Sequence, residues 1–204
     1  MIKELIERDD VFEELEIRSS FGFMAYHGGT LEKATEVIAR ETAELSGSSY
    51  YGLIQKHEDP IHFASTQLIR EKSRALEEFL NHVSIVVTLH GYGREHLFHS
   101  VLLGGRNREL ARHFAPVLRK ALPAYEFETS LEEIPKELRG LHLENPVNYP
   151  PQQGLQLELP PTLRWNREEW GWSDNGGIKR AKQVDELIDA LVLAVSTWNE
   201  SSDN

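Results

Sequence analysis

The stretch FMAYHGGTLEKAT, residues 23–35, joins an apolar run to a helical pattern through a pair of glycines. The apolar run is typical of a buried strand, and it ends on His27. The glycines permit a sharp turn, because glycine adopts backbone angles that other residues avoid. Thr30 can then cap a helix, which would place Glu32 in its first turn. The stretch therefore predicts that a histidine and a carboxylate meet at the carboxyl end of one strand.

A second apolar run, VVTLHGYG at residues 86–93, also ends on a histidine, His90. In α/β proteins the carboxyl ends of strands gather ligands, so His27 and His90 are expected to lie close together. With Glu32 they would supply the three protein ligands that a catalytic Zn²⁺ usually has. Taken singly, each residue has a simpler interpretation, as a strand-end or turn histidine or as a carboxylate near a helix N-terminus. Their joint placement favours one zinc site, although manganese or cobalt would also suit these ligands.

The run GLQLELPP, residues 154–161, carries another carboxylate, Glu158, just before a double proline. Its leucines alternate with Gln156 and Glu158, which predicts a strand with one apolar and one polar face. A glutamate beside a metal-bound water can act as the general base of a hydrolase. The alternative interpretation of Glu158 is a paired carboxylate at the protein surface.

Four further polar residues near the strand ends are candidates for substrate binding. Arg106 and Asn107 follow a short apolar run, and arginine binds carboxylates in a bidentate manner. The alternative is that Asn107 caps a helix and that Arg106 is solvated. Arg164, after the double proline, can bind a carboxylate or stabilise an oxyanion. Asn145 can contact substrate or shape a turn, because Asn-Pro is a common turn signal.

Strand-like and helix-like runs alternate along the chain, which indicates an α/β protein. Its 204 residues suit a single domain, with residues 1–18 and 199–204 expected to be peripheral. The predicted strands are 21–25, 50–54, 83–89, 100–103 and 155–159, and the predicted helices are 31–45, 67–80, 109–121 and 178–195. The segments 123–151 and 164–177 are predicted to be irregular.

Composition excludes several classes of protein and of site. The net charge of −11 disfavours nucleic-acid binding, which needs a basic surface. No apolar run reaches the roughly 18 residues that a membrane span requires. The absence of cysteine excludes disulfides, thiolate ligands and cysteine nucleophiles. The charged N-terminus has no apolar leader, which predicts a cytoplasmic protein.

Five segments occur in the following order between residues 21 and 164: YHGGTLEKATEVIA, VVTLHGYG, VLLGGRNRELA, LRGLHLENPVN and GLQLELPPTLR. Together they resemble the phage-type poly-γ-glutamate hydrolase family. The resemblance implies a zinc carboxypeptidase-like α/β fold, with a central mixed, mostly parallel sheet flanked by helices on both faces. It implies that His27, Glu32 and His90 hold zinc and that Glu158 is the general base. It also implies that the substrate is poly-γ-glutamate, cut at γ-glutamyl bonds, and that a phage-encoded member would be released by host lysis.

Two other functions are compatible with the same residues. The enzyme can instead act on a small γ-glutamyl, N-acyl-amino-acid or muropeptide amide. The alternative of another class is a non-catalytic protein that retains the fold and only binds a partner. The presence of all four residues counts against it, because such a protein would not need His27, Glu32, His90 and Glu158. The sequence leaves the oligomeric state and the phage or cellular origin open.

Overall fold

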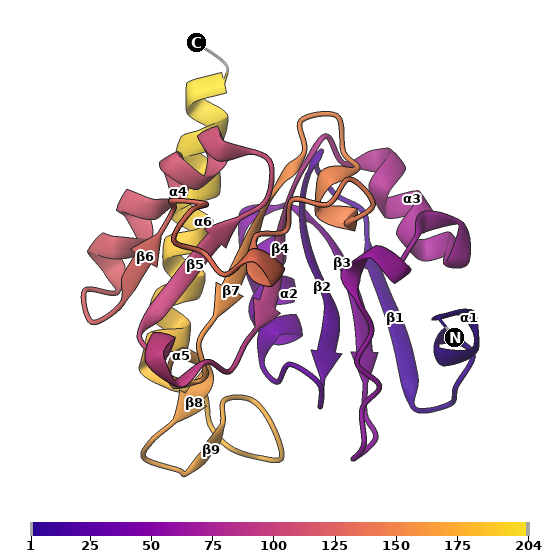
Figure 1. Cartoon of the computed structure of the whole chain (residues 1–204), viewed down its shortest axis with the longest axis horizontal. Helices are drawn as coiled ribbons and strands as arrows, with labels where there is room; N and C mark the ends of the chain where they lie inside the picture. Colours follow the sequence, from indigo (N-terminus) through magenta and orange to yellow (C-terminus); the bar gives the residue numbers. More distant parts are fainter. Residues whose placement is uncertain (1, 203–204) are drawn as a thin grey trace.

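A seven-stranded sheet runs through the middle of the computed structural model, which describes residues 2–202 and the side chains of residues 2–198 (Figure 1). The strand order is β1-β3-β2-β4-β7-β5-β6. The strands are β1 Val11–Glu16, β2 Phe21–Gly29, β3 Ser49–Gln55, β4 Ile85–Gly91, β5 Ser100–Gly104, β6 Glu126–Glu128 and β7 Gly154–Leu159. Four of the six pairings are parallel, and β1–β3 and β5–β7 are antiparallel. The mixed, mostly parallel sheet is therefore confirmed.

Helices cover both faces of this sheet, as predicted. The helices are α1 Ile2–Ile6, α2 Thr35–Ser46, α3 Arg74–His82, α4 Arg108–Ala121, α5 Pro161–Arg164 and α6 Lys182–Ser202. One hydrophobic core lies between the sheet and α2, α4 and α6, and a second lies between the sheet and α1 and α3. Along β2, Phe23 and Ala25 face the first core, whereas Met24 and Tyr26 face the second. This alternation follows from the two-residue period of a strand.

A β-bulge interrupts this alternation just before the predicted metal ligand. The register of β2 against β3 shifts by one residue between Ala25 and Gly28. Strict alternation would direct His27 to the same face as Ala25. Its ring instead contacts Tyr26 and Phe63, which belong to the core on the α3 side of the sheet. The bulge thus brings His27 to the face on which the other polar residues of the site lie.

The turn after β2 differs from the predicted one. Helix α2 begins at Thr35, so Glu32 precedes the helix instead of lying in its first turn. Thr30 does not cap the helix, because its amide and hydroxyl donate to Gln55 O and its hydroxyl also donates to His57 O. The Glu32 amide donates to His27 O over 2.9 Å. This bond closes the loop and folds Glu32 back toward His27.

Several predicted boundaries also change. The chain before Phe21, predicted without a strand, contributes edge strand β1, beside which Ile2 and Leu5 of α1 are buried. The predicted helix 67–80 is helical only from Arg74, where α3 begins, and short 3₁₀ turns precede it. The segment 123–151, predicted to be irregular, includes β6. The predicted loop 164–177 contains a small hairpin of β8 Trp165–Asn166 and β9 Gly171–Trp172.

The last helix extends further than predicted. Helix α6 continues to Ser202, through part of the segment that was expected to be peripheral, and residues 203–204 lie outside the described part. Within residues 2–202, no helix combines the length and the apolar character that crossing a membrane would require.

A side chain at Gly29 would collide with the backbone of the neighbouring strand. Its φ is +77°, and a Cβ atom there would lie 2.1 Å from Gln55 O. We expect Gly29→Ala to lower the free energy of unfolding by about 2 kcal/mol or more, measured by urea denaturation. Gly47→Ala is the matched control, because Gly47 has a φ of +68° but open space around it. Equal losses in both variants would contradict a steric clash at Gly29.

Candidate metal centre

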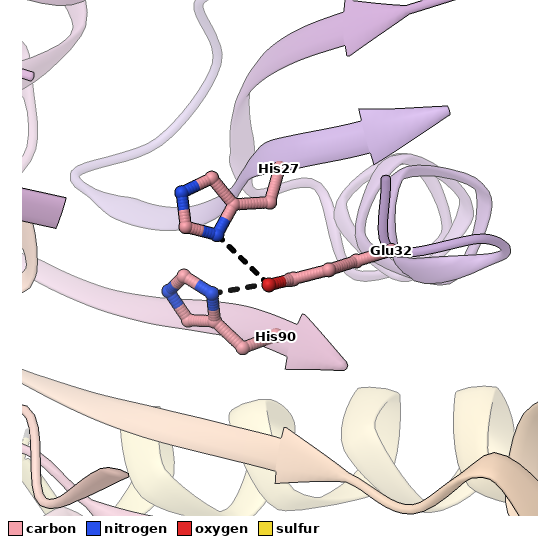
Figure 2. A group of neighbouring side chains, drawn as sticks. All are labelled: His27, Glu32 and His90. Carbon is pink, nitrogen blue, oxygen red and sulfur yellow. Dashed lines mark hydrogen bonds and ion pairs between the residues drawn. The ribbon is translucent and has the colours of Figure 1, made fainter. Parts of the chain in front are cut away.

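His27, Glu32 and His90 form a compact cluster at the carboxyl ends of β2 and β4 (Figure 2). Nδ1 of His27 lies 2.8 Å from Oε1 of Glu32, and Nδ1 of His90 lies 3.2 Å from Oε2. The Gly91 amide also donates to Oε2 over 2.9 Å. Both histidines are only 3% exposed. The structure therefore brings the three predicted ligands together in a nearly closed environment.

The donor atoms suit a zinc ion in both chemistry and spacing. Two imidazoles and a carboxylate are a common set of three protein ligands for Zn²⁺. Bonds of about 2.0–2.1 Å in tetrahedral geometry place ligand atoms roughly 3.3 Å apart, close to the observed separations from His27 and His90 to Glu32. Nε2 of each histidine is buried and has no hydrogen-bond partner among the described residues. The fit to the metal rests on the Nδ1 atoms that face Glu32, because these supply the donor set and the spacing that Zn²⁺ requires.

The protonation preferences of His27 and Glu32 are those of metal ligands. Burial lowers the pKa of His27, which favours its neutral form. Burial raises the pKa of Glu32, but the two neighbouring histidines outweigh it, so the net shift is strongly downward. For His90, burial lowers the pKa, and the charges of Glu32 and Glu158 outweigh it in the upward direction. Glu32 is consequently ionised, whereas His27 is neutral.

Glu158 lies beside this cluster on the neighbouring strand. Strand β7 pairs with β4 so that Glu158 is directly opposite His90. Leu155, Leu157 and Leu159 face the other core, as their alternation predicted. Burial raises the pKa of Glu158 to about 7, where a carboxylate can both accept and release a proton near neutrality.

A chain of buried hydrogen bonds holds Glu158 in place. Gln156 Nε2 donates to Glu158 Oε1 over 2.9 Å, and Asn145 Nδ2 donates to Gln156 Oε1 over 2.9 Å. Asn145 Oδ1 accepts from the hydroxyl of Tyr26 over 3.0 Å. The side chain of Asn145 is thus hydrogen-bonded within the protein, and it also lines the cavity beside Glu158, so its predicted contact with substrate stays a prediction. Tyr26 also lies edge-on to both His27 and His90, a contact that no sequence pattern indicated.

A cavity of about 470 Å³ opens onto the cluster and Glu158. His62 and Phe63, which were not predicted, form part of its wall, and the His62 ring centroid lies 5.5 Å from that of His27. Lys136 and His142 also line this cavity. These residues come from loops far apart in sequence, so only the folded chain shows that they border the site.

The structure does not bring Arg106 and Asn107 to this cavity. Strand β5 runs antiparallel to β7, with Leu102 opposite Glu158 and Gly104 opposite Gln156. The residues after β5 therefore emerge toward the end of the sheet where β7 begins, away from Glu158. Arg106 is exposed, and Asn107 caps α4 by accepting the Leu110 amide over 2.9 Å. Neither residue lines the cavity, although Arg106 Nη1 donates to the backbone oxygen of Leu141, which does. That Arg106 and Asn107 bind substrate therefore stays a prediction.

A capping role for Asn107 leads to a specific stability change. We expect Asn107→Ala to lower the free energy of unfolding by about 1 kcal/mol while kcat/KM stays unchanged, because the lost group is a helix cap. Urea denaturation and a hydrolysis assay measure the two quantities. Asn107→Asp, which can still accept the Leu110 amide, should retain most of the stability. A loss of kcat/KM in Asn107→Ala would instead indicate that Asn107 contacts the substrate.

Arg164 lies on the other side of the Gly91 backbone from the main cavity. It is 4% exposed, and Nη1 donates to Lys33 O over 2.8 Å. Its guanidinium carbon would lie 2.5 Å from a Cβ atom at Gly91, so the two groups are in direct contact. Among the four substrate-binding candidates, Arg164 alone combines burial with a charged group near the metal cluster.

Comparison with known proteins agrees with this geometry. The family model described as poly-gamma-glutamate hydrolase matches residues 4–174. The structure of a bacteriophage poly-gamma-glutamate hydrolase has a TM-score of 0.80 and 19% identity, covering 94% of this chain and 90% of that one. A zinc-free apo form of the protein YNDL has a TM-score of 0.78 and 21% identity, covering 94% and 93%.

A metallo-carboxypeptidase from Burkholderia cenocepacia is more distant, with a TM-score of 0.56 and 11% identity, covering 97% of this chain and 67% of that one. These structural likenesses establish the zinc carboxypeptidase-like fold. A sequence search among curated proteins found no match. Because the family match spans most of the sequence, the chain belongs to the poly-gamma-glutamate hydrolase family and is a hydrolase of amide bonds.

Proposed function

We propose that this protein is a zinc-dependent hydrolase that cuts the γ-glutamyl amide bonds of poly-γ-glutamate. The observation that carries the proposal is the placement of Glu158 directly opposite His90, beside the cluster of His27, Glu32 and His90 and within one cavity. Family membership supports the choice of substrate. The zinc carboxypeptidase-like fold supports metal-assisted hydrolysis.

In this proposal, His27, Glu32 and His90 hold Zn²⁺, which when bound lowers the pKa of water and polarises the scissile carbonyl. Glu158 accepts the proton of the attacking water and then delivers it to the leaving amine. Gln156 orients the Glu158 carboxylate, and Asn145 in turn orients Gln156. Burial of Glu158 excludes bulk water, which keeps the transferred proton between base and leaving group.

The test is cleavage of high-molecular-mass poly-γ-glutamate by the purified, zinc-loaded protein, followed by size-exclusion chromatography and mass spectrometry. We expect a rapid fall in average polymer mass, which indicates cuts within the chain. Release of single units from the chain end would show that the enzyme acts from the end. If the protein cleaves only short γ-glutamyl, N-acyl-amino-acid or muropeptide amides, one of these and not the polymer is its substrate. Heat-inactivated and chelator-treated protein are the controls.

A further inference from the structure

A second cavity, of about 460 Å³, adjoins the metal centre on the far side of Gly91. Gly91 lies in the wall of both cavities, and its amide donates to the predicted zinc ligand Glu32. Arg164, Lys33 and Trp172 line the second cavity and are absent from the first. The two cavities therefore share Gly91 at the end of β4, and the predicted metal ligands line only the first.

Arg164 is incompletely paired for a buried cation. Nη1 donates to a single backbone oxygen, that of Lys33, and Nε is buried without a hydrogen-bond partner. The guanidinium lies 4.9 Å from the ring centroid of Trp172, which fixes the plane of the side chain. A buried guanidinium with an unused N–H group is costly unless another group completes its hydrogen bonds. Arg164 lines the second cavity, so a ligand bound in that space would lie against this side chain.

The charge of the second cavity is opposite to that of the protein. Lys33 Nζ lies 5.9 Å from the Trp172 ring centroid, so a second cation stands near Arg164. No aspartate or glutamate lines this cavity within the described part of the chain, whereas the net charge of the protein is −11. The first cavity, by contrast, contains Glu32, Glu137 and Glu158. A local cationic space on an acidic protein favours an anionic ligand.

Resting on the proposed function, we infer that the second cavity is a subsite for the α-carboxylate of a glutamate unit next to the scissile bond. The planar guanidinium of Arg164 offers its free Nε–H to this carboxylate, and Lys33 adds a second positive charge. A polymer held in this way occupies both cavities. The subsite also explains how a chain of net negative charge binds a polyanion.

Binding to a protein that cannot turn over the ligand tests this subsite. Zinc-loaded Glu158→Gln protein is titrated by calorimetry with a γ-linked glutamate trimer and with the same trimer bearing carboxamides in place of its α-carboxylates. The two test substitutions, made in that background, are Lys33→Met and Arg164→Lys. Lys72→Met is the matched control, because Lys72 is exposed and borders neither cavity.

We expect Arg164→Lys to weaken trimer binding by about tenfold to 100-fold, Lys33→Met to weaken it by about threefold to tenfold, and Lys72→Met to change it less than about twofold. The carboxamide trimer should bind weakly and equally to all variants. Unchanged trimer affinity in Lys33→Met and Arg164→Lys, or equal binding of the two trimers, would overturn the subsite. Absence of trimer binding to the folded, zinc-loaded protein would also overturn it. If Arg164→Lys fails to fold, Lys33→Met decides.

Polymer cleavage by the wild-type protein reports separately on the proposed function. Cleavage with trimer binding that is insensitive to Lys33 and Arg164 rejects only the subsite. Charge-dependent trimer binding without polymer cleavage rejects only the proposal that the enzyme hydrolyses poly-γ-glutamate. The second cavity would then remain a binding site for γ-linked carboxylates.

Discussion

Glu158→Gln should yield a folded, zinc-loaded protein that hydrolyses poly-γ-glutamate about 10²- to 10⁴-fold more slowly than the wild-type protein. The substitution preserves shape, and the new side-chain oxygen can still accept from Gln156 Nε2 as Glu158 Oε1 does. The amide cannot take a proton from water, so the loss falls on kcat. Steady-state kinetics measures the loss, while circular dichroism and plasma mass spectrometry check the fold and the zinc content.

The matched control for this variant is Glu137→Gln, the same chemical change at the rim of the same cavity. Glu137 pairs with Arg94 at the surface, and both side chains are largely exposed. We expect its kcat/KM to stay within about twofold of the wild-type value, because exposed ion pairs contribute little. If Glu158→Gln were as active as Glu137→Gln, Glu158 would not be the general base.

His27→Ala should abolish zinc binding and activity together. The wild-type protein is expected to contain about one zinc per chain, and the variant almost none, because Glu32 and His90 alone leave the ion without its third protein ligand. Zinc should raise the midpoint of thermal unfolding of the wild-type protein, since a ligand that binds only the folded state stabilises it. The variant should show no such rise. Plasma mass spectrometry and a thermal melt with and without zinc make the two measurements.

His62→Ala controls for the loss of an imidazole from the same cavity. The His62 ring lies next to that of His27 but belongs to no cluster of metal-ligating groups in the described part of the chain. The His62→Ala variant should retain zinc, and zinc should still raise the midpoint of its thermal unfolding. If His27→Ala keeps its full zinc content, the metal is bound elsewhere. An unfolding midpoint equal to that of the wild-type protein in the presence of zinc would support the same conclusion.

Much of the site follows from local features of the sequence. His90 and Glu158 are placed by strand alternation, because a two-residue period assigns each side chain to a face without reference to the rest of the chain. The Gly28-Gly29 pair allows the turn that folds Glu32 back to His27, and this too is a local property of the backbone. The mixed α/β fold likewise follows from alternating strand and helix patterns.

The face of His27, the position of Arg106 and the surroundings of Arg164 depended on tertiary structure. A bulge between Ala25 and Gly28 turns His27 toward Tyr26, and it arises from the register of β2 against β3. The antiparallel pairing of β5 with β7 moves Arg106 away from Glu158. Register and strand direction are set by partners distant in sequence, and the sequence pattern of a single strand contains neither. The sequence therefore determined which residues stand at strand ends, and the packing of distant segments decided which of them share one cavity.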